Sequence, residues 1–285
     1  MLSFRPAALA DRPAVVEICS RIWDGDDYVP AVFDDWLAQP EGQFTAAELD
    51  GKVVGVAKLT RLGRQDYWLE GIRVHADFRG RGLAAGLHDY HLDLWRRRGR
   101  PGALRLLTLT DNQAIVKLCE RTGFASIFQV TFAVAEAQAG AQRFTPLTSE
   151  DGDRAFEYIL RAPLYADTRG LCDISWRFRS LTRGFLAERI GAGAAYRWGG
   201  WEGVLLVADG AWEAGPATLV VQFPAVGAER RPAFFADLRG LAAALGKSKV
   251  SWMLPHRPEL LAELAPAGYS QPWPEVFHCF EIRQG

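Results

Sequence analysis

The chain of 285 residues repeats part of its own sequence, and this internal repeat limits the folds that it can adopt. Phe4-Arg5-Pro6 resembles Phe144-Thr145-Pro146, which lies 140 residues later. Asp11 aligns with Asp151, and each aspartate precedes a stretch of helical periodicity. Self-similarity at a fixed separation indicates repeated structural units. The pattern therefore predicts two copies of one α/β arrangement.

A second match lies near the end of each half of the chain. Gly123-Phe124 and Gly268-Tyr269 are 145 residues apart, and each follows a helical stretch and precedes an aromatic strand. We therefore expect one domain over residues 1–138 and a second over residues 142–285. The alternative is that two unrelated α/β domains match by chance.

Hydrophobic periodicity predicts the elements of the first copy. Asp50-Gly51 separates two short apolar strands and favours a two-residue hairpin turn, in which both central residues need a positive φ. Leu83, Leu87, Tyr90 and Leu94 recur at helical spacing and predict an amphipathic helix. The predicted strands cover residues 44–49, 53–59, 69–74 and 104–109, and the predicted helices cover residues 83–98 and 112–121.

The charge balance and the hydropathy pattern exclude several classes of function. With 33 basic and 34 acidic side chains the net charge is −1, which supplies no field for holding nucleic acid. No apolar run approaches the roughly 18 residues of a membrane span. The first residues also lack the pattern of a secretory leader. We expect a cytoplasmic protein that binds neither nucleic acid nor a membrane.

The histidines and cysteines do not follow the spacing of a metal site. His88 and His91 lie three residues apart on the predicted helix, but no third ligand is near them in sequence. We expect core or surface histidines and no bound metal. The cysteines are far apart without a CxxC pair, which is typical of reduced thiols. They are Cys19, Cys119, Cys172 and Cys279.

A glycine-bearing turn joins the strand at 69–74 to the helix at 83–98. It reads Arg79-Gly80-Arg81-Gly82-Leu83-Ala84. Glycines let backbone N–H groups converge on one point, and a following helix adds its positive N-terminal end, so the turn can hold a pyrophosphate. The alternative is that a tight turn needs glycines for steric reasons alone. A nicotinamide loop is excluded, because it would follow the first strand in a GxGxxG pattern.

The segment from Val74 to Leu87 resembles the acyl-coenzyme A loop of the GNAT superfamily of N-acyltransferases. The pattern of that loop is Arg or Gln, two residues, Gly, any residue, and Gly or Ala; Arg79, Gly82 and Ala84 meet it. A later motif of the family, an Asn followed by a helix that ends in Gly-Phe, is matched without gaps by Asn112, Leu118, Glu120, Gly123 and Phe124. The resemblance covers residues 3–135.

The resemblance implies a fold and a co-substrate. Each copy is expected to be α/β, with a mixed, mostly antiparallel sheet flanked by helices. In the family the loop amides hold the pyrophosphate of acetyl-CoA, and the preceding strand pairs with the pantetheine arm. The expected cofactor-binding residues are Ile72, Arg73, Val74, Arg79, Gly80, Arg81, Gly82, Leu83, Ala84 and Asn112.

The second copy resembles the same fold with this loop lost. The stretch at 225–232 has a single glycine, and it ends in Pro232, which has no amide N–H to donate. We expect a degenerate GNAT-like domain that does not hold pyrophosphate.

Glu70 is the best candidate for a general base. On a strand it should share a face with Trp68 and Ile72, near the expected end of the pantetheine arm. An aromatic neighbour would partly desolvate the carboxylate and raise its pKa, which suits removal of a proton from an amine. The alternative is a structural carboxylate paired with Arg73 or Arg105.

Cys119 departs from the family pattern. Many members carry a Tyr at this point of the later helix, where it can protonate the departing thiolate. A thiol is a weak hydrogen-bond donor. We interpret Cys119 as a small buried apolar residue, which leaves the general acid unassigned.

The loop after the first predicted helix supplies the acceptor-side candidates, Trp23, Asp26, Asp27 and Tyr28. Its acids and aromatics suit a cationic amine. With Trp36 following, the stretch resembles that of histidine N-acetyltransferase and its relatives. The alternative is a helix cap and turn with solvated acids.

These observations predict transfer of an acetyl group from acetyl-CoA to the primary amine of a small molecule or amino acid. The alternative is a non-catalytic acyl-CoA-binding regulatory protein, which the absence of the family's Tyr would favour. Neither the acceptor nor the oligomeric state follows from the sequence.

Overall fold

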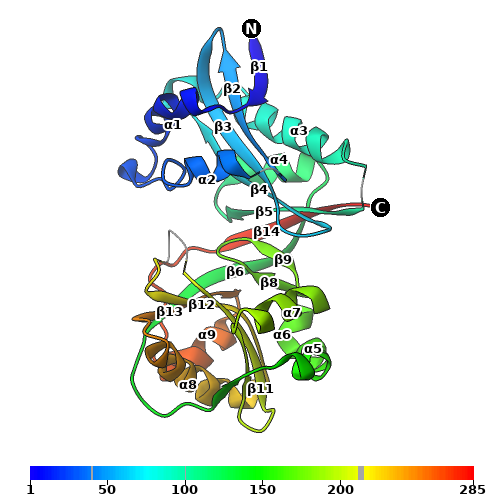
Figure 1. Cartoon of the computed structure of the whole chain (residues 1–285). Coiled ribbons are helices and arrows are strands. Elements are labelled where there is room, and N and C mark those ends of the chain that lie inside the picture. The colour runs from blue at the N-terminus through cyan, green and yellow to red at the C-terminus, as the bar shows by residue number, and fades with distance from the viewer. Residues whose placement is uncertain (40, 100, 211–214) are drawn as a thin grey trace. The chain divides into compact units, whose positions relative to one another are not determined.

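The computed structural model describes residues 1–39, 41–99, 101–210 and 215–285, which form two compact units (Figure 1). Unit 1 comprises Met1–Leu106, Gln113–Ala125 and Phe280–Gly285. Unit 2 comprises Leu107–Asn112 and Ser126–Cys279.

The elements from the N-terminus to the end of the first copy follow the predicted order. They are β1 (Leu2–Pro6), η1 (Leu9–Asp11), α1 (Arg12–Cys19), η2 (Trp23–Gly25), α2 (Phe33–Ala38), β2 (Gln43–Leu49), β3 (Lys52–Arg61), β4 (Asp66–Val74), η3 (Ala76–Phe78), α3 (Leu83–Arg96), β5 (Gly102–Leu109) and α4 (Gln113–Arg121).

The sheet of unit 1 is mostly antiparallel. Its strands lie in the order β1-β2-β3-β4-β5; β1 to β4 pair antiparallel, and β4 pairs in parallel with β5. The hairpin between β2 and β3 turns at Asp50 and Gly51, whose φ angles are 50° and 82°. Two positive φ angles are the requirement of the predicted two-residue turn, so that prediction is confirmed.

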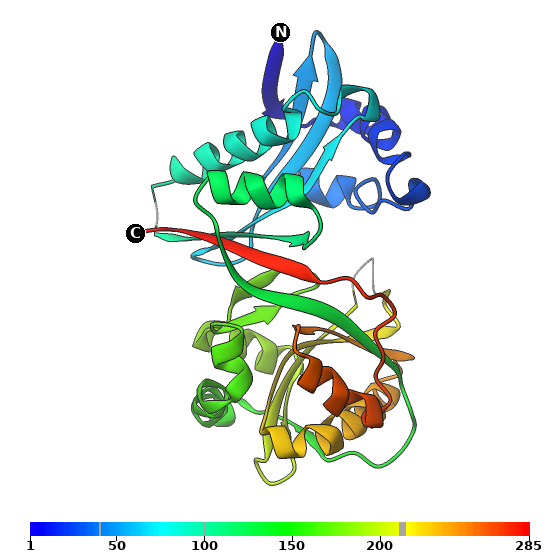
Figure 2. The same ribbon diagram turned by 180° about the vertical axis from the view of Figure 1, so that it is seen from behind.

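Helices cover both faces of this sheet. On one face Val15 and Ile18 of α1 and Trp36 of α2 pack with Val56 of β3. On the other face α3 and α4 pack against β3, β4 and β5, as the view from behind shows (Figure 2). Neighbouring residues of β3 therefore point into different cores, which is why residues 53–60 of the strand are all buried.

Helix α3 forms where the apolar spacing predicted it, but its buried face is rotated from the predicted one. Leu83 and Leu87 are buried as expected, whereas Tyr90 and Leu94 are only half-buried. The remaining buried residues of the helix are His88, His91, Leu92 and Trp95. The buried face of α3 therefore includes two histidine side chains.

The C-terminal residues 280–285 belong to unit 1 although they end the second copy. Phe280 is buried in the core that α3 and α4 cover. Arg105 is buried on β5, and its guanidinium pairs with Asp66 at 2.5 Å and with Glu281 at 2.7 Å. This buried ion network attaches the last strand to unit 1.

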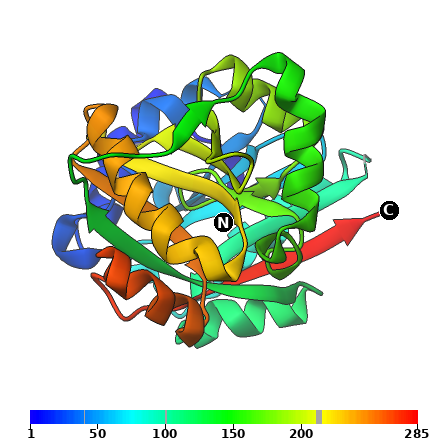
Figure 3. The same cartoon turned by 90° about the horizontal axis from the view of Figure 1, so that it is seen from below.

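Unit 2 has a similar arrangement of strands and helices, with an additional two-stranded sheet formed by β8 (Leu171–Asp173) and β9 (Phe178–Ser180). Its main strands lie in the order β6-β13-β12-β11-β10-β7, and α8 packs against β12 and β13 (Figure 3). The elements are β6 (Ala125–Glu136), β7 (Phe144–Pro146), η4 (Ser149–Asp151), α5 (Gly152–Arg161), α6 (Pro163–Asp167), β8 (Leu171–Asp173), β9 (Phe178–Ser180), α7 (Arg183–Gly191), β10 (Ala195–Trp198), β11 (Gly203–Asp209), β12 (Thr218–Val226), η5 (Ala228–Arg230), α8 (Arg231–Ala244), β13 (Lys249–Pro255), α9 (Pro258–Leu264), η6 (Ala265–Ala267) and β14 (Phe277–Gln284).

The matched aspartates of the two copies, Asp11 and Asp151, make the same type of backbone hydrogen bond. The Asp11 carboxylate accepts from the N–H of Ala8 at 2.8 Å, and the Asp151 carboxylate accepts from the N–H of Thr148 at 2.9 Å. Each bond satisfies an amide at the start of a helical segment. The sequence matches therefore mark structurally equivalent positions.

The two units divide the chain differently from the contiguous segments 1–138 and 142–285 that the sequence predicted. Most of β6 counts with unit 2, where it pairs with β13, and residues 280–285 count with unit 1. The reason is that each copy's last strand joins the other unit. Local sequence contains no signal for such an exchange, because it depends on which edge the strand pairs with.

Among the residues that the structure describes, no helix combines the length and the apolar character that crossing a membrane requires.

Removal of the Glu281 carboxylate should destabilise the protein. Glu281→Ala leaves the buried Arg105 without one of its anions, and breaking a buried ion pair costs about 3–5 kcal/mol of the free energy of unfolding. Arg283→Ala is the matched control, because Arg283 contacts the same carboxylate from an exposed position and should cost less than about 1 kcal/mol. Urea denaturation of both variants measures the difference. Equal losses would contradict a structural role for the network.

Candidate functional site

The turn between β4 and α3 has the geometry of an anion cradle. Gly80 and Gly82 adopt φ angles of 76° and 77°, and Gly82 is the N-cap of the 14-residue helix α3. A Cβ built on either glycine would meet no atom within 4 Å. The glycines are therefore needed for their backbone conformation, and the space beside their amides is open to a ligand.

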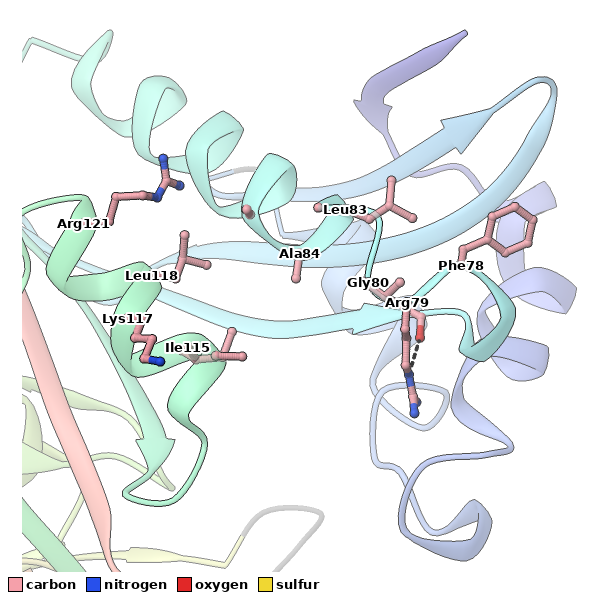
Figure 4. A pocket seen from close by; sticks show the side chains of 13 residues that line it. Phe78, Arg79, Gly80, Leu83, Ala84, Ile115, Lys117, Leu118 and Arg121 are labelled. Carbon is pink, nitrogen blue, oxygen red and sulfur yellow. Dashed lines mark hydrogen bonds between the residues drawn. The ribbon is translucent and has the colours of Figure 1, made fainter.

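A cavity of about 480 Å³ adjoins this turn (Figure 4). The end of β4, the turn and the start of α3 form one wall, and α4 forms the other. The lining residues are Val74, Phe78, Arg79, Gly80, Gly82, Leu83, Ala84, Ala85, Ala114, Ile115, Lys117, Leu118 and Arg121.

Basic side chains surround the cavity. Arg79 and Lys117 are exposed and line it, and Arg121 lines it while pairing with Asp89 at 2.8 Å. Arg81 lies on the turn and stacks on the ring of Phe78 at 5.1 Å. Cations beside a helix N-terminus favour a phosphate-bearing ligand.

Six of the ten residues expected to bind a cofactor line this cavity: Val74, Arg79, Gly80, Gly82, Leu83 and Ala84. Ile72, Arg73 and Arg81 are not among the lining residues. Asn112 belongs to unit 2, and its role stays a prediction.

The wall that α4 supplies was not predicted from the sequence. Ala114, Ile115, Lys117, Leu118 and Arg121 line the cavity. Their spacing of three, four and seven residues is that of one helix face. That spacing could have identified the wall, because the helix itself was predicted.

A β-bulge changes the faces of β4. Arg73 lies opposite Val56, and Glu70 lies opposite Lys58, so two residues of β4 face one residue of β3 between these pairs. The extra residue turns Ile72 into the core on the α3 side. The prediction that Glu70 shares a face with Ile72 was therefore wrong, because an inserted residue reverses the alternation.

Gly71 in the bulge is required by both conformation and space. Its φ is 63°, and a Cβ there would lie 2.4 Å from the ring of Trp36. The aromatic side chain of α2 therefore packs directly on the bulge, beside Glu70.

Glu70 is half-buried and contacts the neighbouring strand β3. Thr60 Oγ1 donates a hydrogen bond to Glu70 Oε1 at 2.5 Å. The two arginines considered as structural partners form ion pairs elsewhere: Arg73 with Asp27, and Arg105 with Asp66 and Glu281. The role of Glu70 as a base stays a prediction.

Asp27 and Arg73 join the acceptor-side loop to β4. Arg73 Nε and a terminal nitrogen donate to the two Asp27 oxygens at 2.5 and 3.2 Å. The guanidinium also lies 4.9 Å from the ring of Trp23 and 5.4 Å from that of Tyr28. Three of the four predicted acceptor residues thus surround one arginine.

The ion pair between Asp27 and Arg73 limits which residues of the loop can bind an amine. The Asp27 side chain is fully buried and neutralises Arg73, so it is committed within the protein. Asp26 and Trp23 are exposed. Among the predicted acceptor residues, these two lie open to a ligand.

Cys119 is completely buried in the core beneath α4. Desolvation raises the pKa of its thiol to about 12. The interpretation as a buried apolar residue is confirmed, and its neighbour Leu118 faces the cavity instead.

The histidines of α3 are core residues. The Nδ1 of His91 donates to the Leu87 carbonyl at 3.0 Å, and its Nε2 accepts from Thr45 Oγ1 at 2.9 Å. His88 contacts Thr122 at 3.0 Å. Within the described part of the chain, no group of three or more His, Cys, Asp and Glu residues is arranged to hold a metal.

The second copy lacks the corresponding groups. Strand β12, which like β4 precedes a short 3-10 turn and a long helix, contains no Asp or Glu. Its Pro224 has no backbone N–H to donate. The following turn contains Gly227 at a φ of −64°, with Pro232 in the first turn of α8. These differences remove the carboxylate and the glycine cradle.

Comparison with known proteins identifies similar sequences. A model of the acetyltransferase (GNAT) family matches residues 13–124. The chain is 33% identical over 122 residues to the N-alpha-acetyltransferase RimI of Mycobacterium tuberculosis. This alignment covers 41% of this chain and 75% of that protein. It is 28% identical over 113 residues to histidine N-acetyltransferase of Xenopus tropicalis. This second alignment covers 39% of this chain and 35% of that protein.

A solved structure resembles the whole chain. A tandem GNAT protein from the clavulanic acid biosynthesis pathway aligns with a TM-score of 0.59 and 16% identity, over 100% of this chain and 99% of that one. At this identity the similarity concerns the fold. It confirms the predicted tandem α/β architecture.

The buried histidines of α3 should make stability depend on acid pH. Desolvation lowers the pKa of His88 and of His91 from 6.5 to about 4. Between these pH values the unfolded chain binds protons that the folded chain does not, so the free energy of unfolding falls as the pH drops. The slope is at most about 1.4 kcal/mol per pH unit for each histidine.

Urea denaturation at a series of pH values between 4 and 7 measures this slope. His91→Gln should reduce the slope of the free energy of unfolding against pH by the contribution of one histidine. An unchanged slope in the double variant with His88→Gln would show that other groups dominate the acid response.

Proposed function

Because the chain belongs to the acetyltransferase (GNAT) family, we propose that it is an N-acetyltransferase that uses acetyl-CoA and acts on the primary amine of a small molecule or amino acid. The observation that carries the proposal is the open glycine cradle at the N-terminus of α3, beside a cavity with basic side chains.

The residues around the cradle suit the pyrophosphate of acetyl-CoA. The amides of the turn at 79–82 and the N-terminal end of α3 would hold its negative charge. Arg79 and Lys117 add positive charge at the edge of the cavity. The apolar residues of α3 and α4 would then cover the less polar part of the cofactor.

The edge of β4 offers a place for an extended ligand. The parallel pairing of β4 with β5 runs from Asp66 to Trp68, and the strand continues to Val74. Backbone groups along this edge suit pairing with the amide groups of a pantetheine arm, as in the addition of a strand.

Glu70 is proposed to take the proton that an ammonium group must lose before its nitrogen can attack. A half-buried carboxylate next to the bulge suits this task. Acetyl-CoA, when bound, supplies a thioester carbonyl and a thiolate leaving group. With the Cys119 thiol buried and its pKa high, the chain places no acid at the family's usual Tyr position.

The acceptor is proposed to lie against the loop that follows α1. Trp23 and Asp26 are exposed there, and Asp27 holds the loop to β4 through Arg73. The two relatives are named for the acetylation of an N-alpha amine and of histidine, which supports an amine acceptor.

The proposal is tested by incubating the full chain with acetyl-CoA and a panel of amino acids and small amines, with free thiol release as the readout. Turnover with a member of the panel supports the proposal. Tight acetyl-CoA binding without turnover on any amine would favour the non-catalytic alternative.

Gly82→Asp should abolish acetyl-CoA binding. The substitution places a side chain and a negative charge where the pyrophosphate is proposed to lie. Gly51→Asp is the matched control, since Gly51 also has a positive φ of 82° and open space around a Cβ, but lies in the β2–β3 hairpin. Calorimetry of the full chain should show one binding site, lost in the first variant and kept in the second.

Two results would contradict the cofactor assignment. One is unchanged affinity in Gly82→Asp. The other is a second acetyl-CoA site of similar affinity, because unit 2 lacks the glycine cradle.

Glu70→Gln should lower kcat/KM about a hundredfold or more, because the amide keeps the shape of the side chain but cannot accept the proton. The acidic limb of the pH profile should flatten, while the affinity for acetyl-CoA should change little. Retention of both rate and pH profile would identify Glu70 as structural, and the base would then have to be sought elsewhere.

A further inference from the structure

The hydroxyl of Thr60 donates a hydrogen bond to the Glu70 carboxylate. Thr60 is buried near the end of β3, with 5% of its surface exposed. Its Oγ1 donates to Glu70 Oε1 at 2.5 Å, across the β3–β4 ladder. A short hydrogen bond to a carboxylate is among the stronger polar contacts in a protein.

Two features fix the direction of this bond. Thr60 is β-branched, so its χ1 angle is restricted and its hydroxyl points in a defined direction. It also lies on a strand that is paired on both sides, with β2 and with β4. The donor is therefore held more firmly than a donor on a loop would be.

A buried cation lies on the same face of β3. Lys58 is directly opposite Glu70 in the strand register, is completely buried, and donates to the Trp36 carbonyl at 2.7 Å. Side chains of directly opposite residues lie about 5 Å apart at Cβ. Both residues of β3 next to Glu70 thus favour the charged form of its carboxylate.

The arginines on this face form ion pairs with carboxylates. Arg73 of β4 pairs with Asp27 of the preceding loop. Arg105 of β5 pairs with Asp66 and, on β14, with Glu281. A change at Thr60 leaves these ion pairs in place.

From this geometry we propose that Thr60 is a positioning residue for Glu70. Its hydroxyl holds Oε1, which fixes the direction of the carboxylate and favours its charged form. The inference rests on the proposed function in one respect, namely that the oriented carboxylate serves as the base. The hydrogen bond and its effect on ionisation are testable without any acceptor.

The decisive variant is Thr60→Val, which keeps the shape of the side chain and removes the hydroxyl. NMR of protein labelled with ¹³C at the glutamate carboxyl follows ionisation directly, and the signal missing in Glu70→Gln identifies Glu70. The titration midpoint of this signal should move to higher pH by about one unit or more in Thr60→Val. Thr60→Ser restores a hydroxyl and should bring the midpoint back by at least about half of that shift.

Thr45→Val is the matched control. Thr45 is a buried threonine on the neighbouring strand β2, but its hydroxyl contacts His91. Its loss should leave the Glu70 midpoint in place. If Thr60→Val does not fold, Thr60→Ala is titrated instead, with the same expected direction.

An unchanged midpoint in the folded Thr60 variant would overturn the proposal, as would an equal shift in Thr45→Val. The kinetic readout separates this result from failure of the proposed function. If Glu70 is the base, the acidic limb of kcat/KM moves with the NMR midpoint. A midpoint that moves while Glu70→Gln keeps full activity supports the Thr60 contact and refutes the catalytic assignment of Glu70.

Discussion

Strand β4 pairs along most of its length with one neighbour and over only three residues with the other, and this difference determines the layout of the candidate site. Its parallel pairing with β5 runs from Asp66 to Trp68, whereas its pairing with β3 continues to Val74. Because a strand can pair with an added extended segment, the later part of β4 suits an extended polar ligand. The cavity between α3 and α4 adjoins the end of the same strand.

The bulge in β4 separates two environments. On the face of Ile72 the strand contributes to the apolar core under α3. On the face of Glu70 it carries charged groups whose partners come from other elements, as in the Asp27–Arg73 pair. Charges in a largely buried layer are tolerated when they are paired. On the same face, Glu70 accepts a hydrogen bond from Thr60.

The two copies share a scaffold but differ in the groups that chemistry needs. The capping aspartates Asp11 and Asp151 make the same backbone contact in both units. Strand β4 carries the carboxylate of Glu70, whereas strand β12 of the second copy contains no Asp or Glu. Elements that hold the fold have been kept, whereas the cradle and the carboxylate are found in the first copy. The glycine cradle and the Glu70 carboxylate therefore both belong to unit 1.

The sequence alone determined the features that neighbouring residues control. The hairpin at Asp50-Gly51, the helix that begins at Leu83 and the glycine turn before it follow from local conformational preferences, and so do the equivalent positions of the repeat. The burial of Cys119 was also predictable. The hairpin, the helix and the glycine turn each depend on residues within a few positions of one another in the chain.

The tertiary structure decided the features that depend on register and on distant partners. The bulge at Gly71 reversed the predicted face of Ile72, since one inserted residue changes the side to which a strand residue points. Arg73 found its partner in Asp27, 46 residues away, and Arg105 found Glu281, 176 residues away. Such pairs arise when strands and loops pack together, because burial makes an unpaired charge costly and selects whichever partner the fold brings near.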